Sequence, residues 1–293
     1  MPELPEVETV KRGLAPVLEG CRIDTVELRR TGLRFPFPGG FSERLAGRSV
    51  ERLSRRAKYI IADIEGGQIL TIHLGMTGRF WIKPGATSGK IGSFAHAAGN
   101  DPAHDHVVFH MQSGATVTYN DARRFGYMDL FPAAALETHP HFKSLGIEPL
   151  GNALNAAFLA EAARGRRTDL KAFLMDQRII AGLGNIYVCE ALYRAGLDPH
   201  RTASALARRN GQPSERAERL IPAIRSVLDD AIRAGGSTLR DYRHADGALG
   251  YFQHSFAVYG REGEPCVRTG CRGSVRRTIQ AGRSTFHCPA CQR

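Results

Sequence analysis

Residues 59–82 read YIIADIEGGQILTIHLGMTGRFWI, and this stretch predicts the fold of the first half of the chain. Three runs rich in β-branched and aromatic residues, YIIADI, QILTIHL and GRFWI, follow one another at strand length. Gly66 and Gly67 separate the first two runs, and a Gly-Gly pair between strands is typical of a tight hairpin turn. The stretch therefore predicts consecutive antiparallel strands.

The strand pattern continues on both sides of this stretch. RIDTVEL (22–28), HVVFHM (106–111) and ATVTY (115–119) are further strand-like runs, and Ser113-Gly114 marks a second hairpin. Closely spaced strands with tight turns favour an antiparallel β-sandwich. Residues 84–103 are rich in Gly, Ala, Ser and Pro, so they indicate a surface loop.

Apolar residues at helical spacing predict the other elements. Near the start of the chain, Val7, Val10, Leu14 and Val17 lie on one face of a helix over residues 3–19. Pro5 falls in the first turn of this helix, where proline is tolerated. After residue 148 the pattern predicts helices at 156–163, 170–177, 186–195 and 215–233, with a glycine-rich turn at 181–184 and a polar loop at 235–253.

Two closely spaced cysteine pairs follow near the end of the chain. Cys266 and Cys271 form C-x4-C, and Cys288 and Cys291 form C-x2-C after a further sixteen residues. Two such pairs joined by a short loop suit a tetrahedral zinc site, and four thiolates leave no open position for catalysis. The Arg-rich, strand-like residues between the pairs indicate a zinc ribbon rather than a helical finger. Disulfides are the alternative, but the chain shows no secretory signal.

Composition limits the class of protein. A length of 293 residues with 42% hydrophobic residues suggests about two globular domains. No apolar run reaches the roughly 18 residues of a membrane span. The first ten residues carry three Glu and no basic residue, unlike a signal peptide. The expected location is therefore the cytoplasm.

The net charge of +11 favours a polyanionic partner, most often nucleic acid. The last 33 residues contain seven Arg and two Glu, so the positive charge is concentrated there. A generally basic, solvated surface is the alternative explanation.

The second residue offers a nucleophile. If Met1 is removed, Pro2 carries a free secondary amine, which can attack an electrophilic carbon and form an iminium ion. An α-amino group has a reference pKa near 8, so part of it is unprotonated at neutral pH. Glu3 and Glu6 are neighbouring candidates for acid–base work. Taken alone, Met-Pro is a weak signal, because many proteins begin this way and it is far more often an ordinary helix start.

Several motifs together resemble the bacterial formamidopyrimidine-DNA glycosylases, in the order of that family and across the whole chain. The motifs are MPELPEVETV (1–10), RRAKY (55–59), HLGMTG (73–78), DARRFGYMD (121–129), LMDQRIIAGLGNIYVCEAL (174–192), GGSTLRDY (235–242), GYFQ (250–253), VYGREGEPC (258–266) and the cysteine-rich ending. The resemblance implies an α+β multidomain fold with DNA in the cleft between two lobes. It divides the chain into an N-terminal antiparallel β-sandwich with flanking helices (1–148), a helix–two-turn–helix domain (149–257) and a zinc-ribbon finger (258–293).

The resemblance also implies an activity: base-excision repair of oxidised purines, 8-oxoguanine and formamidopyrimidines, in duplex DNA. Pro2 matches the nucleophile and Glu3 the general acid that helps to open the sugar. Lys58 matches a proton donor in β-elimination, although as a strand-borne cation it would equally suit a phosphate. Arg283 matches the zinc-finger arginine of δ-elimination. One structural zinc and no redox or nucleotide cofactor are implied, in a monomer that acts on the DNA of the bacterial nucleoid.

Other residues match DNA-contacting positions of the family. Met76, Arg123 and Phe125 match the side chains that fill the space left by the extruded base; for Met76 and Phe125 plain core packing is the alternative. Asn185 lies where a glycine-rich turn enters a helix, and backbone N–H groups there suit a phosphate. The remaining matches are His73, His104, Arg124, Arg166 and Lys171, each of which would also be ordinary on a solvated surface.

Two departures and two alternatives remain. The family's first cysteine pair is usually C-x2-C, and the 84–103 loop is longer than usual, which affects the alignment of His104. The sister endonuclease VIII type, which prefers oxidised pyrimidines, begins MPEGPE and lacks the Met, Arg and Phe set, whereas this chain has Leu4. A non-catalytic zinc-ribbon DNA-binding protein is the second alternative, and the presence of Pro2, Glu3 and Lys58 argues against it.

Overall fold

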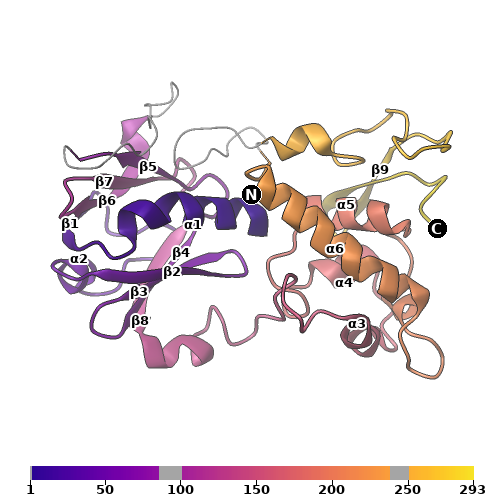
Figure 1. The fold of residues 1–293 in the computed structure, drawn as a ribbon, viewed down its shortest axis with the longest axis horizontal. Helices are drawn as coiled ribbons and strands as arrows, with labels where there is room; N and C mark the ends of the chain where they lie inside the picture. The colour runs from indigo at the N-terminus through magenta and orange to yellow at the C-terminus, as the bar shows by residue number, and fades with distance from the viewer. Residues whose placement is uncertain (1, 86–100, 238–250) are drawn as a thin grey trace. The chain divides into compact units, whose positions relative to one another are not determined.

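The computed structural model describes residues 2–85, 101–237 and 251–293 (Figure 1). The loops expected at 84–103 and 235–253 lie largely outside these residues. The chain forms two compact units. One, here called the sandwich unit, comprises Met1–Lys143 and Ala234–Gln253; the other, the helical unit, comprises Ser144–Arg233 and His254–Arg293.

The sandwich unit contains two four-stranded sheets in which every pairing is antiparallel. One sheet has the order β1 (Ile23–Leu28), β6 (Asp105–Met111), β7 (Thr116–Asn120), β5 (Arg79–Lys83). The other has the order β2 (Val50–Arg56), β3 (Tyr59–Ile64), β4 (Gln68–His73), β8 (Tyr127–Pro132). The predicted antiparallel sandwich is therefore confirmed.

The first hairpin forms as its glycines predict. Ile64 pairs with Gln68, and both Gly66 (φ 88°) and Gly67 (φ 72°) adopt the left-handed conformation that glycine accepts without strain. Inward-facing residues of both sheets, such as Ile60, Leu70 and Val117, share one hydrophobic core.

Within the described residues, one long helix and three short helical elements complete the sandwich unit. Helix α1 (Leu4–Leu18) places Val7, Val10, Leu14 and Val17 in the shared core and packs against β2, β3 and β5. Three shorter elements are α2 (Phe41–Leu45) and the 3-10 helices η1 (Pro102–His104) and η2 (Ala133–Thr138).

The helical unit contains the predicted helices in nearly the predicted positions. They are α3 (Ala156–Ala163), α4 (Leu170–Met175), α5 (Asn185–Ala195) and α6 (Glu215–Arg233), with 3-10 turns η3 (Ala203–Leu206) and η4 (Phe252–Ser255), of which η4 begins in the sandwich unit. Helix α5 packs against α4, α6 and the hairpin that follows. All of its residues except Asn185 and Arg194 are buried, so α5 is the central element of this unit.

The hairpin consists of β9 (Arg276–Gln280) and β10 (Arg283–His287). Its turn residues Ala281 (φ 47°) and Gly282 (φ 72°) both have positive φ, which matches the two-residue turns favoured between antiparallel strands. The strand-like stretch between the cysteine pairs thus forms the ribbon expected from the sequence.

Candidate active site

The start of the chain is buried and held by a carboxylate. Pro2 is buried and Glu3 is 3% exposed, directly before α1. The Glu3 N–H donates to Glu6 Oε2 (2.8 Å), and Glu6 Oε1 accepts from the N–H (2.8 Å) and the hydroxyl (3.0 Å) of Ser237. Gly236 has φ +78°, and a Cβ there would lie 3.1 Å from Glu6 Oε1. Glu6 therefore joins the first residues to a segment more than 200 residues away.

Lys58 lies in the two-residue turn between β2 and β3 and is 8% exposed. Its neighbour Ala57 has φ 53°, and the Ala57 carbonyl accepts from Arg55 Nη1 (2.9 Å). Arg55 Nε also donates to Glu8 Oε2 of α1 (3.2 Å). Burial raises the pKa of Glu8, but hydrogen bonds and charges from neighbouring basic side chains outweigh it and lower that pKa. An ionised Glu8 thus ties the Lys58 turn to the helix that follows Pro2.

His73, at the end of β4, is a neutral imidazole. Burial, followed by the charges of Lys58 and Arg34, lowers the pKa of His73 to about 4. Its Nδ1 accepts from the Gly75 N–H (3.1 Å), so the proton of the neutral ring lies on Nε2. The ring stacks on Tyr127 at 5.1 Å between centroids. His73 is therefore a hydrogen-bond donor rather than a cation near neutral pH.

Asp121 organises the segment 121–126. It is completely buried and accepts from the Gly126 N–H (2.8 Å), the Tyr119 hydroxyl (3.3 Å) and the Thr77 hydroxyl. Thr77 Oγ1 in turn accepts from the Arg123 N–H (3.1 Å). This network fixes the turn 75–78 against the segment 121–126.

The network presents Met76, Arg123 and Phe125 on two adjoining loops. A Cβ on Gly75 would lie 2.3 Å from the Phe125 carbonyl carbon, which shows how closely the two backbones approach. Phe125 is 44% exposed, and the Arg123 guanidinium lies 4.6 Å from the centre of its ring. Phe125 is thus outside the core, while Met76 is half-buried.

Two further predicted residues belong to the same region. Arg124 is exposed with φ 55°, and its N–H donates to the Asp121 carbonyl (3.2 Å). The His104 carbonyl accepts from the Asp121 N–H (3.0 Å), and its imidazole lies 3.7 Å from Asp101. The structure therefore links His104 and Arg124 through the backbone N–H and the backbone carbonyl of Asp121.

In the helical unit, two predicted residues meet at one carbonyl. Lys171 Nζ and Asn185 Nδ2 both donate to the Ser284 carbonyl, each at 3.0 Å. Lys171 also donates to Thr285 Oγ1 (2.7 Å) and is only 1% exposed. Arg283 starts β10 beside them and is exposed. Arg166, also exposed, follows α3 and donates from Nε to the Ala162 carbonyl (2.8 Å).

Glu190 is an organising residue that the sequence reading missed. It is 1% exposed on α5, and its carboxylate accepts the backbone N–H groups of Ala257, Val258 and Tyr259 at 2.8–3.0 Å. These residues lead into the first cysteine pair. In the sequence, the feature that could have pointed to Glu190 is its position as an acidic residue within the mostly apolar run NIYVCEAL.

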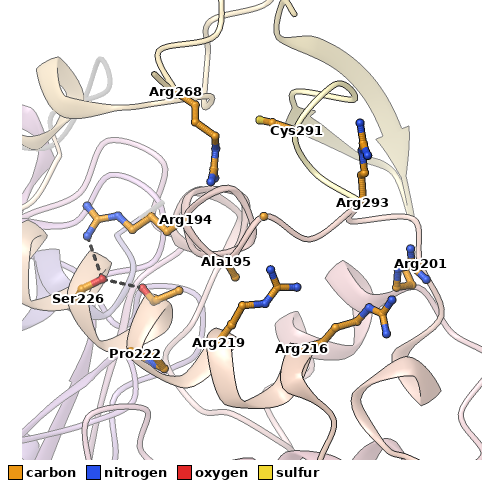
Figure 2. Close-up of a pocket in the computed structure, with 12 residues that line it drawn as sticks. Arg194, Ala195, Arg201, Arg216, Arg219, Pro222, Ser226, Arg268, Cys291 and Arg293 are labelled. Atoms are coloured by element: carbon orange, nitrogen blue, oxygen red, sulfur yellow. Dashed lines mark hydrogen bonds between the residues drawn. The ribbon is translucent and has the colours of Figure 1, made fainter. Parts of the chain in front are cut away.

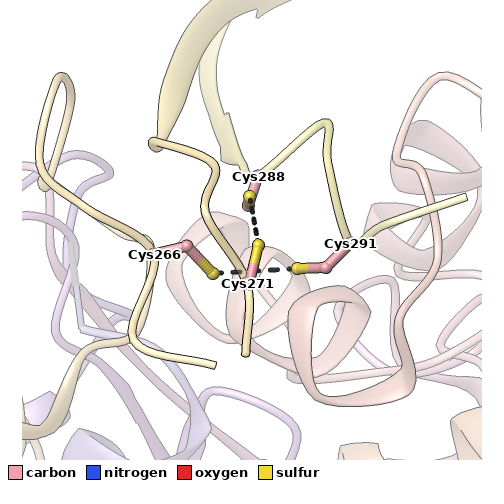
Figure 3. A group of neighbouring side chains, drawn as sticks. All are labelled: Cys266, Cys271, Cys288 and Cys291. Carbon is pink, nitrogen blue, oxygen red and sulfur yellow. Dashed lines mark hydrogen bonds between the residues drawn. The ribbon is translucent and has the colours of Figure 1, made fainter. Parts of the chain in front are cut away.

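The four C-terminal cysteines converge on one point (Figure 3). The Sγ atoms of Cys266 and Cys291 are 3.7 Å apart, as are those of Cys271 and Cys288. A metal with bonds of about 2.3 Å to four sulfurs at tetrahedral angles requires sulfur separations of about 3.8 Å. The Tyr193 hydroxyl lies 3.4 Å from Cys266 Sγ, and the Gly273 N–H donates to Cys271 Sγ (3.4 Å). The four-cysteine set thus fits a tetrahedral metal ion, and the C-x4-C spacing does not prevent this.

Two family models match the chain. Residues 1–128 match the formamidopyrimidine-DNA glycosylase N-terminal domain, and residues 145–243 match the formamidopyrimidine-DNA glycosylase H2TH domain. Proteins named formamidopyrimidine-DNA glycosylase from Azorhizobium caulinodans and Rhodopseudomonas palustris (strain BisA53) are 59% and 60% identical, each match covering 100% of both chains.

Solved structures agree with these matches. The MutM (Fpg) protein of Thermus thermophilus is 38% identical with a TM-score of 0.81, covering 99% of this chain and 98% of that one. The Lactococcus lactis Fpg in complex with abasic-site DNA is 30% identical with a TM-score of 0.83, covering 100% of both chains. The chain belongs to the formamidopyrimidine-DNA glycosylase family. Among its described residues, no helix is long and apolar enough to span a membrane.

Proposed function

We propose that the chain is a bifunctional DNA glycosylase and AP lyase that removes 8-oxoguanine and formamidopyrimidines from duplex DNA. Family membership over the full length supports the class of reaction. The observation that carries the residue-level proposal is the buried Pro2-Glu3 start, anchored through Glu6 to Ser237. The oxidised-pyrimidine alternative is not favoured, because the relatives named above are formamidopyrimidine-DNA glycosylases.

The chemistry begins at the Pro2 amine once Met1 has been removed. The amine forms a bond to C1′ of the damaged nucleotide as the bond from C1′ to the base breaks. Glu3 donates a proton to the ring oxygen as the sugar opens, which leaves an iminium ion between Pro2 and C1′. Elimination of the 3′ and then the 5′ phosphate completes strand cleavage. Lys58 serves proton transfer in the first elimination and Arg283 contacts the phosphate in the second.

The exposed loop residues serve base extrusion. Met76 and Phe125 are the apolar groups that occupy the vacated space, and Arg123 is the directional donor that reads the partner base. The exposure of Phe125 and the fixed backbone of both loops support this assignment.

Phosphate contacts are assigned to the remaining predicted residues. Arg124 and Arg166 are exposed cations, while His73, as a neutral donor, and His104 suit hydrogen bonds to the lesion strand. The backbone N–H groups at the start of α5, next to Asn185, suit a phosphate. Because Lys171 is buried, we assign it to positioning: with Asn185 it holds the Ser284 carbonyl beside Arg283.

We further propose that Cys266, Cys271, Cys288 and Cys291 hold Zn²⁺. The ion would cross-link the ribbon structurally and take no part in proton transfer, because all four positions are filled by thiolates. With it, residues 258–293 act as a finger beside a helix–two-turn–helix segment (149–257) and a catalytic segment (1–148). Because the proposed substrate is duplex DNA, we expect the enzyme to act at the bacterial nucleoid.

Borohydride trapping on a duplex containing 8-oxoguanine tests the mechanism. The native protein should form a covalent complex, and Pro2→Gly should lower single-turnover base release at least about tenfold, because the secondary amine is lost. Glu43→Gln, an exposed change on α2, is the matched control. Undiminished base release by Pro2→Gly, or an intact Met1 in the mass spectrum of active protein, would contradict the mechanism.

A further inference from the structure

An arginine-lined pocket lies within the helical unit, at the C-terminal end of α5 (Figure 2). Its volume is about 740 Å³. Six of its twelve lining residues are arginine, and none is Asp, Glu or aromatic. The arginines are Arg194, Arg201, Arg216, Arg219, Arg268 and Arg293, and none of them has a role in the proposed reaction.

Two of the six arginines are engaged by the protein itself. Arg194 Nη1 donates to Asp230 Oδ2 (2.6 Å) and to Ser226 Oγ (3.1 Å), and Figure 2 shows its side chain turned towards Ser226. Arg268 donates to the Tyr193 carbonyl near the end of α5 and lies 4.9 Å from the Tyr193 ring centre. These two residues supply the cations that the negative end of a helix favours.

The other four arginines lack such partners. Within the part of the chain that the structure describes, Arg201, Arg216, Arg219 and Arg293 form no salt bridge, and Arg201 Nε is buried without a hydrogen-bond acceptor. Arg216 and Arg219 leave α6 on the same side and Arg201 lies beside them (Figure 2). No lining residue carries a carboxylate side chain. The pocket therefore holds an uncompensated excess of positive charge.

The position of these arginines on α6 is unfavourable without an anion. Arg216 lies in the first turn of α6, where the helix dipole favours negative groups, and Arg219 lies directly after that turn. Glu215 and Glu218 occupy this turn, but neither lines the pocket. Mutual repulsion of the guanidinium groups adds to the free-energy cost of placing these arginines together. A bound anion would relieve both effects.

We propose that this pocket binds a small polyphosphate anion through its phosphate oxygens. Guanidinium forks match phosphate oxygens with paired N–H groups, and several together match a chain of two or three phosphates. The volume falls within the roughly 300–1,000 Å³ of small-molecule sites. Since no aromatic side chain lines the pocket, a nucleoside attached to the phosphates would not be recognised.

Calorimetric titration of tripolyphosphate into the full-length, metal-loaded protein at fixed ionic strength tests the proposal. One saturable site per chain is expected. Arg216→Ala and Arg219→Ala should each weaken binding at least about tenfold, because each removes charge-assisted hydrogen bonds. Arg209→Ala, an exposed arginine outside the pocket, is the matched control and should bind like the native protein. ATP and GTP should bind about as tightly as tripolyphosphate.

Two further measurements distinguish binding of a small polyphosphate from binding of other polyanions. Arg219→Ala should retain native affinity for undamaged duplex DNA and native borohydride trapping; an equal loss of DNA affinity would assign the arginines to the DNA backbone and overturn the proposal. A hexaglutamate peptide should bind far more weakly than tripolyphosphate, and equal binding would overturn the assignment to phosphate. Absence of a saturable site, or an equal effect of Arg209→Ala, would also overturn it.

Discussion

Three buried acids, Glu6, Asp121 and Glu190, organise this protein at the residue scale. Each is at most 2% exposed and accepts two or more hydrogen bonds from backbone or hydroxyl donors. A buried carboxylate is stable only when its oxygens are paired in this way. Each acid joins segments that are distant in the sequence or lie on separate loops, so each positions residues of the proposed site without having to contact DNA.

Glu6→Gln tests this positioning role. The amide keeps the volume but has one acceptor oxygen in place of two, so either the Glu3 N–H or the Ser237 donors lose their partner. An unpaired buried donor costs about 1–3 kcal/mol. We expect a lower melting temperature and base release reduced about tenfold at pH 7, measured in single turnover. Glu43→Gln is the matched control, and native kinetics for Glu6→Gln would contradict the role.

Arg123 is expected to set the preference for the base opposite the lesion. An extruded lesion leaves a partner cytosine with O2 and N3 as acceptors, whereas adenine presents a different edge and a larger ring. Excision opposite C should therefore exceed excision opposite A. Hydrogen bonds from a charged donor contribute about 1.5–3 kcal/mol each, so Arg123→Ala should reduce that preference roughly ten- to a hundredfold.

Met76→Ala is the comparison variant for Arg123→Ala, because it removes volume without a directional donor. In single-turnover excision from the same duplexes, Met76→Ala should retain more of the preference for C over A than Arg123→Ala does. Equal native rates opposite C and A would remove Arg123 from this role. A strong native preference for oxidised pyrimidines would contradict the proposed substrate class.

At the scale of elements, most helices and strands follow from the sequence, but the short helix α2 and two strands do not. Helix α6 agrees with its predicted bounds because its apolar positions repeat at helical spacing. β2 was not predicted, since only Val50 and Leu53 of VERLSRR are buried. β8 was not predicted as a separate run, because YMDLFP lacks alternation. Pairing with β3 and β4 determines both strands, and no local pattern shows that pairing.

The candidate site was less predictable from local pattern. The cysteine spacing alone indicates the metal cluster. Residue chemistry made Pro2 and Glu3 candidates, whereas the family resemblance assigned their roles and that of Lys58. The bond between Glu6 and Ser237 spans 231 positions in the sequence, so no periodicity could reveal it. Asp121 and Glu190 become evident only when their backbone donors are placed.

The β9–β10 hairpin should depend on the four-cysteine cluster. Cys271→Ser removes one thiolate ligand, and metal binding to such small modules is coupled to their folding. We therefore expect weaker zinc retention and, because Arg283 starts β10, DNA affinity lower by at least about tenfold. Cys21→Ser, at a cysteine packed against the sandwich core, is the control. Elemental analysis that finds no zinc in freshly purified, active protein would contradict the assignment.

At the scale of the whole molecule, the proposed chemistry and much of the positive charge are carried by different units. Pro2, Glu3 and Lys58 belong to the sandwich unit, while Arg166 and Arg283 belong to the helical unit. The last 33 residues, with seven Arg and two Glu, extend the charge of the helical unit. The proposed roles therefore assign the nucleophile and its neighbouring acid–base groups to the sandwich unit, and a large part of the affinity for the DNA backbone to the helical unit.

This division predicts how DNA binding depends on salt. Contacts from Arg124, Arg166 and Arg283 displace about three counterions, so the logarithm of the binding constant should fall with that of salt concentration with a slope of about −2.7. Arg283→Ala should reduce the slope to about −1.8 on damaged and undamaged duplexes alike, because a phosphate contact carries no sequence information. Arg209→Ala, exposed and outside the proposed contacts, should keep the native slope. Fluorescence anisotropy over a range of about 50 to 300 mM salt measures these slopes, and an unchanged slope for Arg283→Ala would show that Arg283 does not contact a phosphate.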